Sequence, residues 1–101
     1  MESSVAIVKP DVQSWVQTHE DWVLVDGKLQ VSYRFKDFVA AFSFLTRVAM
    51  VAEELEHHPH IENAYNEVTL TLSTHDAGDI VTEKDLALAA KIEELKIELQ
   101  N

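Results

Sequence analysis

The stretch from Glu53 to Asp76, EELEHHPHIENAYNEVTLTLSTHD, contains the change of hydrophobic period that decides the fold. Upstream of it, apolar residues recur at alternating steps of four and three and predict an amphipathic helix: Phe38, Phe42, Leu45, Ala49 and Ala52. Within it, apolar and polar residues alternate over positions 67–72 and predict a strand, with Tyr65 on its polar face. Asp37 is expected to cap the helix, and Pro59 to end it, because proline disfavours helical backbone in the residue before it.

A β-hairpin is predicted before that helix. Asp26 and Gly27 separate two apolar-rich runs, and both residue types tolerate the positive φ that a tight turn requires. After the turn, apolar residues alternate with polar ones, which indicates a strand with one dry face: Leu29, Val31, Tyr33 and Phe35. Ahead of the hairpin, DVQSWVQTH predicts a short helix that Pro10 and Asp11 open.

The C-terminal part predicts a loop, THDAGDIV, followed by a last helix. Thr82 and Asp85 have the spacing of a capping box at the start of that helix. An apolar stripe follows at helical spacing: Leu88, Ile92, Leu95 and Leu99. The stripe is typical either of packing onto a sheet or of a contact between helices of two chains.

The order of these elements predicts an α+β fold with two layers. An antiparallel sheet with one polar face is expected to carry helices on the other face, and PHIENAYN is compatible with one more strand. A chain of 101 residues suffices for one core, so we expect a single domain over residues 1–101. The open edges of so small a sheet favour pairing with a second copy.

Composition narrows the class of protein. The absence of cysteine excludes disulfides, thiolate metal sites and a cysteine nucleophile. The formal charge of −10 disfavours binding to nucleic acid, because phosphate backbones are also negative. MESSVAIVKPDV lacks the features of a secretory signal, and no apolar run approaches the ~20 residues that span a bilayer. We therefore expect a soluble cytoplasmic protein without a membrane partner.

Three histidines are expected to meet at one rim of the sheet. His57 and His58 lie where the helix ends, and His75 follows the strand. The negative end of the helix dipole stabilises an imidazolium ion, and Glu53 and Glu56 add negative charge nearby. Converging imidazoles supply a proton donor and a proton acceptor, which is what elimination of water requires.

Simpler interpretations of these residues stay open. His57 and His58 could be a helix cap and a surface residue. His58 and His60 could chelate a metal ion with His75 or Asp76, although the HExxH pattern of metalloenzymes is absent. The spacing of the residues alone does not choose among these interpretations.

The spacing of His57-His58-Pro59, Tyr65, His75 and Asp85 resembles the signature of the pterin-4a-carbinolamine dehydratases. The segments SYRFKDFVAAFSFLTRVAMVAEELEHHP, VTLTLSTHDAG and TEKDLALAAKIEEL are similar to that family as well. The resemblance implies dehydration of 4a-hydroxytetrahydrobiopterin, or a related pterin, to the quinonoid dihydropterin without cofactor or metal. This step regenerates the pterin that aromatic amino-acid hydroxylases use.

The resemblance also implies roles and an assembly. His57 and His75 would be acids toward the hydroxyl, each for one stereoisomer, and His58 would hold the substrate. The remaining residues expected at the substrate are Glu53, Glu56, Pro59, Ser73, Thr74, Asp85 and Trp22. The implied fold is a four-stranded antiparallel sheet with helices on one face, in a homodimer or homotetramer.

Two departures from the family pattern bear on substrate choice. The turn Gly78-Asp79-Ile80-Val81 replaces a shorter glycine-rich turn, and His60 follows the proline where an acid is frequent. Two other functions stay open: a non-catalytic interaction module, and a pterin-binding accessory protein, for example in molybdopterin metabolism. Three histidines at signature spacing favour an enzyme over a pure scaffold.

Overall fold

A computed structural model describes residues 11–100. The elements follow in the order α1 (Val12–Thr18), β2 (Trp22–Val25), β3 (Lys28–Arg34), α2 (Phe38–Leu55), β4 (His60–Ala64), β5 (Glu67–Leu72), the 3-10 turn η1 (His75–Ala77) and α3 (Glu83–Gln100). PHIENAYN therefore does form a strand, β4. The expected contribution of Pro10 to the first helix lies outside the described residues.

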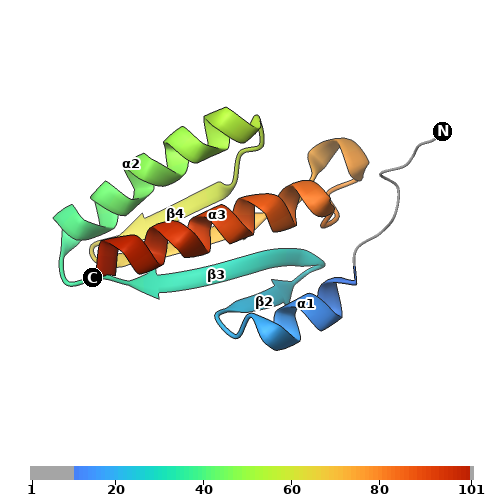
Figure 1. The fold of residues 1–101 in the computed structure, drawn as a ribbon, viewed down its shortest axis with the longest axis horizontal. Coiled ribbons are helices and arrows are strands. Elements are labelled where there is room, and N and C mark those ends of the chain that lie inside the picture. Colours follow the sequence, from blue (N-terminus) through green and yellow to red (C-terminus); the bar gives the residue numbers. More distant parts are fainter. Residues whose placement is uncertain (1–10, 101) are drawn as a thin grey trace.

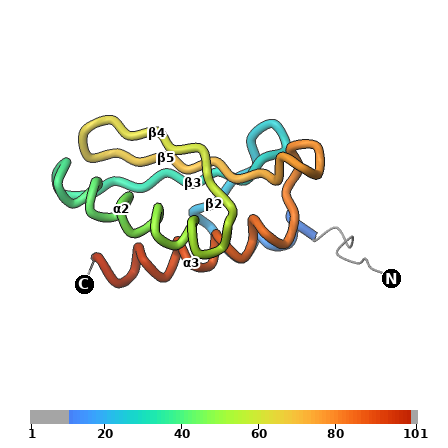
Figure 2. The backbone as a smooth tube through the Cα atoms, turned by 90° about the horizontal axis from the view of Figure 1, so that it is seen from above, coloured from blue at the N-terminus to red at the C-terminus, as the bar shows by residue number. Residues whose placement is uncertain are grey.

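The four strands form one antiparallel sheet in the order β2-β3-β5-β4. Helices α2 and α3 run side by side across one face of this sheet (Figure 1), and the view turned by 90° shows both on the same side of the strands (Figure 2). The prediction of a two-layer α+β fold is confirmed. No helix within residues 11–100 is long and apolar enough to cross a membrane.

The core lies between the sheet and the two long helices. Leu29 pairs with Leu72, Val31 with Leu70 and Tyr33 with Val68, so that the apolar faces of β3 and β5 coincide. The side chains that fill the core from the sheet are all buried: Trp22, Leu29, Val31, Tyr33, Phe35, Val68, Leu70 and Leu72. The period-two prediction for both strands is confirmed, because a one-residue change of register would have exposed every one of these side chains.

Tight turns connect both strand pairs. Asp26 (φ 52°) and Gly27 (φ 76°) form the turn of the predicted hairpin. Tyr65 (φ 53°) lies in the turn between β4 and β5 and is 65% exposed. The prediction that Tyr65 lies on the polar face of a strand was wrong, and the turn holds it at the end of the sheet opposite to His60.

Helix α2 buries a different face from the one predicted. Asp37 does cap it, accepting a bond from the Ala40 N–H at 2.8 Å. Leu45 and Ala52 are buried as expected, but Phe38, Phe42 and Ala49 are exposed. Their places are taken by Ala41, Phe44 and Val48. The helix is rotated about its axis relative to the prediction, because Phe44 packs against the aromatic rings of the sheet. The centroid of its ring lies 5.6 Å from that of Tyr33 and 5.0 Å from that of Phe35.

The end of α2 is set by Glu56 rather than by Pro59. Glu56 has a left-handed backbone (φ 53°), and the His57 N–H donates to the Ala52 carbonyl at 3.0 Å. This pattern of bonds closes a helix without a glycine. The helix thus ends at Leu55, and the chain turns at Glu56, three residues before Pro59.

The stripe on α3 belongs to the core of the same chain. Leu88 and Ile92 are fully buried, and Leu95 and Leu99 are partly buried against the core. Of the two interpretations of the stripe, packing onto the sheet is the one that the structure supports. Asp85 accepts a hydrogen bond from the Thr82 N–H at 2.8 Å, which is the reciprocal bond of the predicted capping box.

Candidate active site

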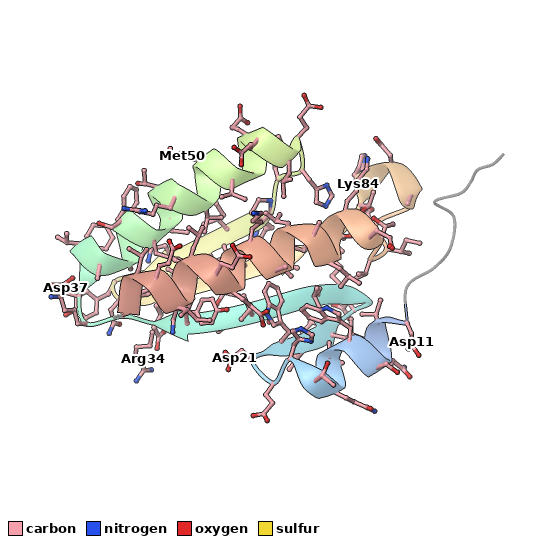
Figure 3. All side chains as sticks on the ribbon, in the orientation of Figure 1. Asp11, Asp21, Arg34, Asp37, Met50 and Lys84 are labelled. Atoms are coloured by element: carbon pink, nitrogen blue, oxygen red, sulfur yellow. The ribbon has the colours of Figure 1, made fainter. Side chains whose placement is uncertain are left out.

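The end of α2, the end of β5 and the start of α3 converge at one end of the sheet. Figure 3 places Lys84, near the start of α3, at the opposite end of the molecule from Asp37, which caps the start of α2. Side chains that follow α2 in the sequence therefore face side chains that follow β5. His57, His58 and His75 all lie in this region and line one pocket, as the sequence predicted.

His57 is held by a buried carboxylate. Its Nε2 lies 2.5 Å from Oδ1 of Asp85, whose side chain is 0% exposed, while the side chain of His57 is 11% exposed. An ionised carboxylate only accepts hydrogen bonds, so Nε2 carries the proton of this contact. Nδ1 forms no hydrogen bond with the described part of the chain and is the nitrogen left for a ligand.

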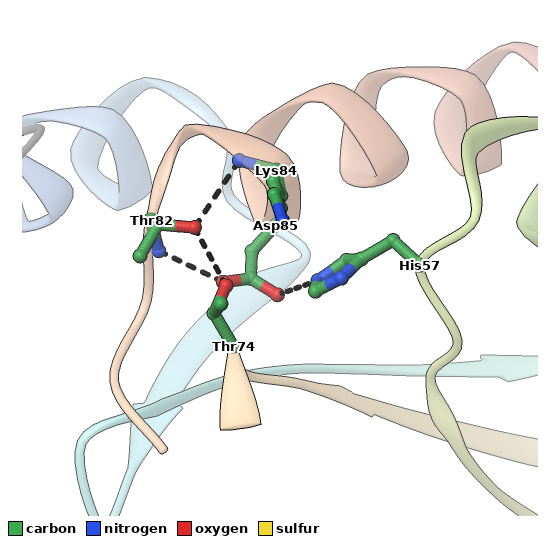
Figure 4. Close-up of polar contacts among 5 residues, drawn as sticks. All are labelled: His57, Thr74, Thr82, Lys84 and Asp85. Carbon is green, nitrogen blue, oxygen red and sulfur yellow. Dashed lines mark hydrogen bonds and ion pairs between the residues drawn. The ribbon is translucent and has the colours of Figure 1, made fainter. Parts of the chain in front are cut away.

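Asp85 is itself held by two threonines (Figure 4). Its Oδ2 accepts from Thr74 Oγ1 at 2.8 Å and from the Thr82 backbone N–H at 2.8 Å. The two threonine hydroxyls lie 2.6 Å apart. Because the Thr74 proton goes to Asp85, the Thr82 hydroxyl donates to Thr74, and it accepts in turn from the Lys84 N–H at 3.3 Å. Oδ2 of Asp85 thus accepts two hydrogen bonds, and the Thr82 hydroxyl holds the Thr74 hydroxyl that donates one of them.

The other two histidines are exposed and paired with surface acids. His58 Nε2 lies 2.6 Å from Glu53 Oε2, with side chains 62% and 78% exposed. His75 Nδ1 lies 3.1 Å from Asp79 Oδ1, with side chains 90% and 52% exposed. Such exposed pairs are weak, about 0–1 kcal/mol each, so both imidazoles are free to reorient toward a ligand.

The acids expected beside His57 are arranged differently from the prediction. Glu53 pairs with His58 and not with His57, since the left-handed turn at Glu56 carries His57 inward toward α3. Glu56 lines the pocket without a hydrogen bond to any described histidine. Asp85, expected at the substrate, is fully buried behind His57.

The three histidines surround a pocket of about 280 Å³, which we call the histidine pocket. It is lined by Glu56, His57, His58, Ser73, Thr74, His75, Asp76 and Lys84. Pro59 lines the adjoining hollow on the uncovered face of the sheet. A larger hollow of about 700 Å³ lies between α2 and α3, but no histidine lines it and it lacks a paired acid and base of this kind.

Trp22 is not part of the site. It is 2% exposed in the core, where its Nε1 donates to Glu93 at 3.1 Å and its ring meets the edge of Trp15. The alternative metal shell is not formed either, because no group of three or more acids and histidines within residues 11–100 is arranged to hold an ion.

Sequence reasoning missed three participants: Thr82, Lys84 and Asp79. Thr82 was recognisable only as a helix cap, and the capping spacing did place it beside Asp85. Asp79 and Lys84 carry no sequence signal of their own, since a single acid or lysine in a loop or first helical turn is common.

Comparison with known proteins agrees with this geometry. A sequence model of the family described as "Pterin 4 alpha carbinolamine dehydratase" matches residues 6–95. The chain belongs to this family. A relative from Solibacter usitatus, named "Putative pterin-4-alpha-carbinolamine dehydratase", is 47% identical over 85 residues, which are 84% of this chain and 88% of the relative. A relative of the same name from Rhizobium meliloti is 51% identical over 77 residues, 74% of this chain and 73% of that protein.

Two solved structures of the dehydratase fold are similar to this chain. The "transcriptional coactivator/pterin dehydratase" of Brucella melitensis superposes with a TM-score of 0.79 at 37% identity, over 88% of this chain and 96% of that one. A pterin dehydratase-like protein described as a RuBisCO assembly factor in the alpha-carboxysome gives a TM-score of 0.63 at 26% identity, over 76% and 90%. The fold thus occurs in proteins whose titles describe different roles.

Proposed function

We propose that this protein catalyses the dehydration of a 4a-hydroxytetrahydropterin to the quinonoid dihydropterin and water. The observation that carries the proposal is the contact between His57 and the buried Asp85 at the wall of a pocket that two further histidines line. Capping of α3 occupies only Oδ2 of Asp85, and its Oδ1 is committed to one imidazole at the wall of the pocket. An enzyme needs such a device to fix a proton donor relative to its substrate.

In this proposal the leaving hydroxyl takes a proton from an imidazolium, and the C4a–O bond breaks as water forms. The electron pair of the ring nitrogen forms the new C=N bond, and its N–H proton passes to a neutral imidazole. His57, through Nδ1, serves as acid for one stereoisomer, and His75 for the other. His58 mainly holds the ring and assists proton transfer at the nitrogen.

The remaining residues act through these three. Asp85 positions His57 from behind and does not contact the substrate, which revises the role expected from the sequence. Glu53 orients His58 through their contact at 2.6 Å, while Glu56 and Pro59 shape the entrance. Ser73 offers polar groups of the strand end to the flat ring. The Thr74 backbone, expected to do the same, is already engaged, since its N–H donates to the Ile80 carbonyl and its own carbonyl accepts from the Ala77 and Asp79 N–H groups.

The direct test is the rate of dehydration of a 4a-hydroxytetrahydropterin generated in situ. Activity should rise above the spontaneous rate, and His58→Ala should raise KM more than His57→Ala or His75→Ala does. A matched control is His19→Ala, because His19 is stacked on Trp15 far along the chain from the pocket. No acceleration by the folded wild-type protein would refute the proposal.

A place in tetrahydropterin recycling follows if the activity holds, since the product is the form that a reductase returns to the cofactor pool. We also include a homodimer or homotetramer in the proposal. Edge strand β4 leaves its own N–H and C=O groups open, and Ile61, on the face that α2 and α3 cover, is still 41% exposed. Pairing with a second copy would cover both.

A further inference from the structure

A second hollow adjoins the histidine pocket on the face of the sheet opposite to α2 and α3. Its volume is about 430 Å³, and we call it the outer hollow. Its lining consists of Lys28, His58, Pro59, His60, Thr71, Ser73 and His75. His58, Ser73 and His75 also line the histidine pocket, so the two spaces adjoin at these three residues.

The strand register explains why these residues meet. Leu29 and Leu72 are paired and point into the core, so their neighbours Lys28 and Ser73 point to the uncovered face. Thr71 lies on the same face, paired with His60 of β4. Because β5 lies between β3 and β4, Lys28 and His60 flank the end of β5 from its two sides.

The outer hollow is basic in a chain whose formal charge is −10. One ammonium group and three imidazoles line it, and none of its lining residues is an acid. Two of the imidazoles have acid partners outside the lining, His58 with Glu53 and His75 with Asp79. Lys28 forms no ion pair with an acid among residues 11–100. His60 Nε2 lies 3.9 Å from Glu62 Oε2, and both side chains are exposed. Lysine and imidazole N–H groups together suit an anionic oxygen ligand.

The outer hollow is the larger of the two spaces. Its volume of about 430 Å³ compares with about 280 Å³ for the histidine pocket, and His58, Ser73 and His75 line both. A side chain on a ring in the histidine pocket therefore has the basic lining of the outer hollow next to it.

We infer that the outer hollow binds an anionic group, a phosphate or a carboxylate, on the side chain of the pterin whose ring occupies the histidine pocket. This inference rests on the proposed function and adds a substrate class to it. Lys28 is the main charge partner, and His60 is the second. The physiological substrate is then an acidic pterin rather than one with a neutral side chain.

Fluorescence titration of the full chain with three stable pterins tests the inference: 6-hydroxymethylpterin, its phosphate monoester and pterin-6-carboxylic acid. At low salt the two anionic pterins should bind about tenfold more tightly than the neutral one. About 0.5 M salt should reduce this ratio, because screening weakens exposed charges. The phosphate and carboxylate arms show which of the two groups the hollow prefers.

Variants locate the preference. Lys28→Gln should lower the affinity for the anionic pterins about tenfold more than the affinity for the neutral one, and His60→Glu should also reduce the ratio. Lys91→Gln is the matched control, since Lys91 is an exposed lysine of α3 outside both spaces, and it should keep the wild-type ratio. Equal affinity for all three pterins, or a ratio that Lys28→Gln leaves unchanged, overturns the inference.

The two proposals fail in different ways. If a neutral 4a-hydroxytetrahydropterin is dehydrated but anionic pterins bind no better, the inference about the outer hollow is wrong and the proposed function stands. If none of the three pterins binds and no dehydration occurs, both are wrong.

Discussion

The hydroxyl of Thr74 offers the sharpest test of the network behind His57. Thr74 is 6% exposed, donates to Asp85 at 2.8 Å and receives a bond from Thr82 at 2.6 Å. Thr74→Val keeps the shape and the β-branched side chain that suit this position, but it removes both bonds. Thr74→Ser keeps the hydroxyl and is the matched control.

A hydrogen bond to a charged group contributes about 1.5–3 kcal/mol, and the carboxylate of Asp85 stays buried when this bond is lost. We therefore expect Thr74→Val to lower the free energy of unfolding by about 2 kcal/mol. For a domain of this size that is a fall of about 8–16 °C in Tm. Thr74→Ser should remain within about 3 °C of the wild type, since a serine hydroxyl can make the same bonds.

Thr74→Val should also affect the position of His57, because Asp85, which holds His57, is then fixed by one hydrogen bond fewer. We expect a fall of about tenfold in kcat with little change in KM, since valine keeps the size and shape of the side chain at this place in the pocket wall. Thermal unfolding followed by circular dichroism and initial rates at a temperature well below both transitions measure the two effects. A Thr74→Val protein with wild-type Tm and wild-type kcat would show that the threonine network does not hold Asp85.

Three further predictions concern the histidines, a buried tyrosine and the oligomer. His57→Ala and His75→Ala should each retain partial activity on a mixture of stereoisomers, and each should spare a different isomer. The dehydration rate of the double variant should be lower by a further factor of about 10² to 10⁴. A folded His75→Ala protein with full activity on both isomers would contradict the role assigned to His75. Burial, and then the negative charges of two nearby acids, raise the pKa of Tyr33 above its usual value of 10.0. The unfolded chain therefore loses this proton first, so stability should fall as the pH rises above about 10; urea unfolding at about pH 8 and pH 11 should show a smaller loss in Tyr33→Phe but not in the control Tyr65→Phe. Light scattering should give a dimer or tetramer that Ile61→Lys shifts toward monomer, and a monomeric wild type at micromolar concentration would refute the open-edge argument.

Sequence reasoning predicted the sheet well because its strands have only two faces. The alternation at Leu29, Val31 and Tyr33 leaves a single register that buries the apolar side, and the turn at Asp26 and Gly27 fixes the pairing. A helix has more ways to turn. Helix α2 is apolar over much of its circumference, so several stripes compete, and the contact of Phe44 with rings far along the chain decides among them.

The site shows the same limit. The positions of His57, His58 and His75 at the ends of predicted elements indicated that they lie close together, and all three do line one pocket. Spacing could not show which acid serves which histidine. Glu53 lies four residues before His57 in the sequence, but a left-handed residue between them turns the imidazole inward toward Asp85 instead. Such a reversal depends on the φ angle of one non-glycine residue, for which the sequence carries no signal.

The pairing of His57 with Asp85 also links the chemistry of this protein to its stability. Asp85 caps the start of α3 and, through His57, ties that start to the end of α2, so one carboxylate holds together two helices and one catalytic group. Polar groups at a helix end ordinarily contribute little to a core, and this holds for the exposed His58 and His75. Removal of His57 instead leaves a buried carboxylate with one partner fewer, at a cost of about 1–3 kcal/mol. Lost activity in that variant therefore has two physical sources, and only a measurement below its unfolding transition isolates the loss of the acid.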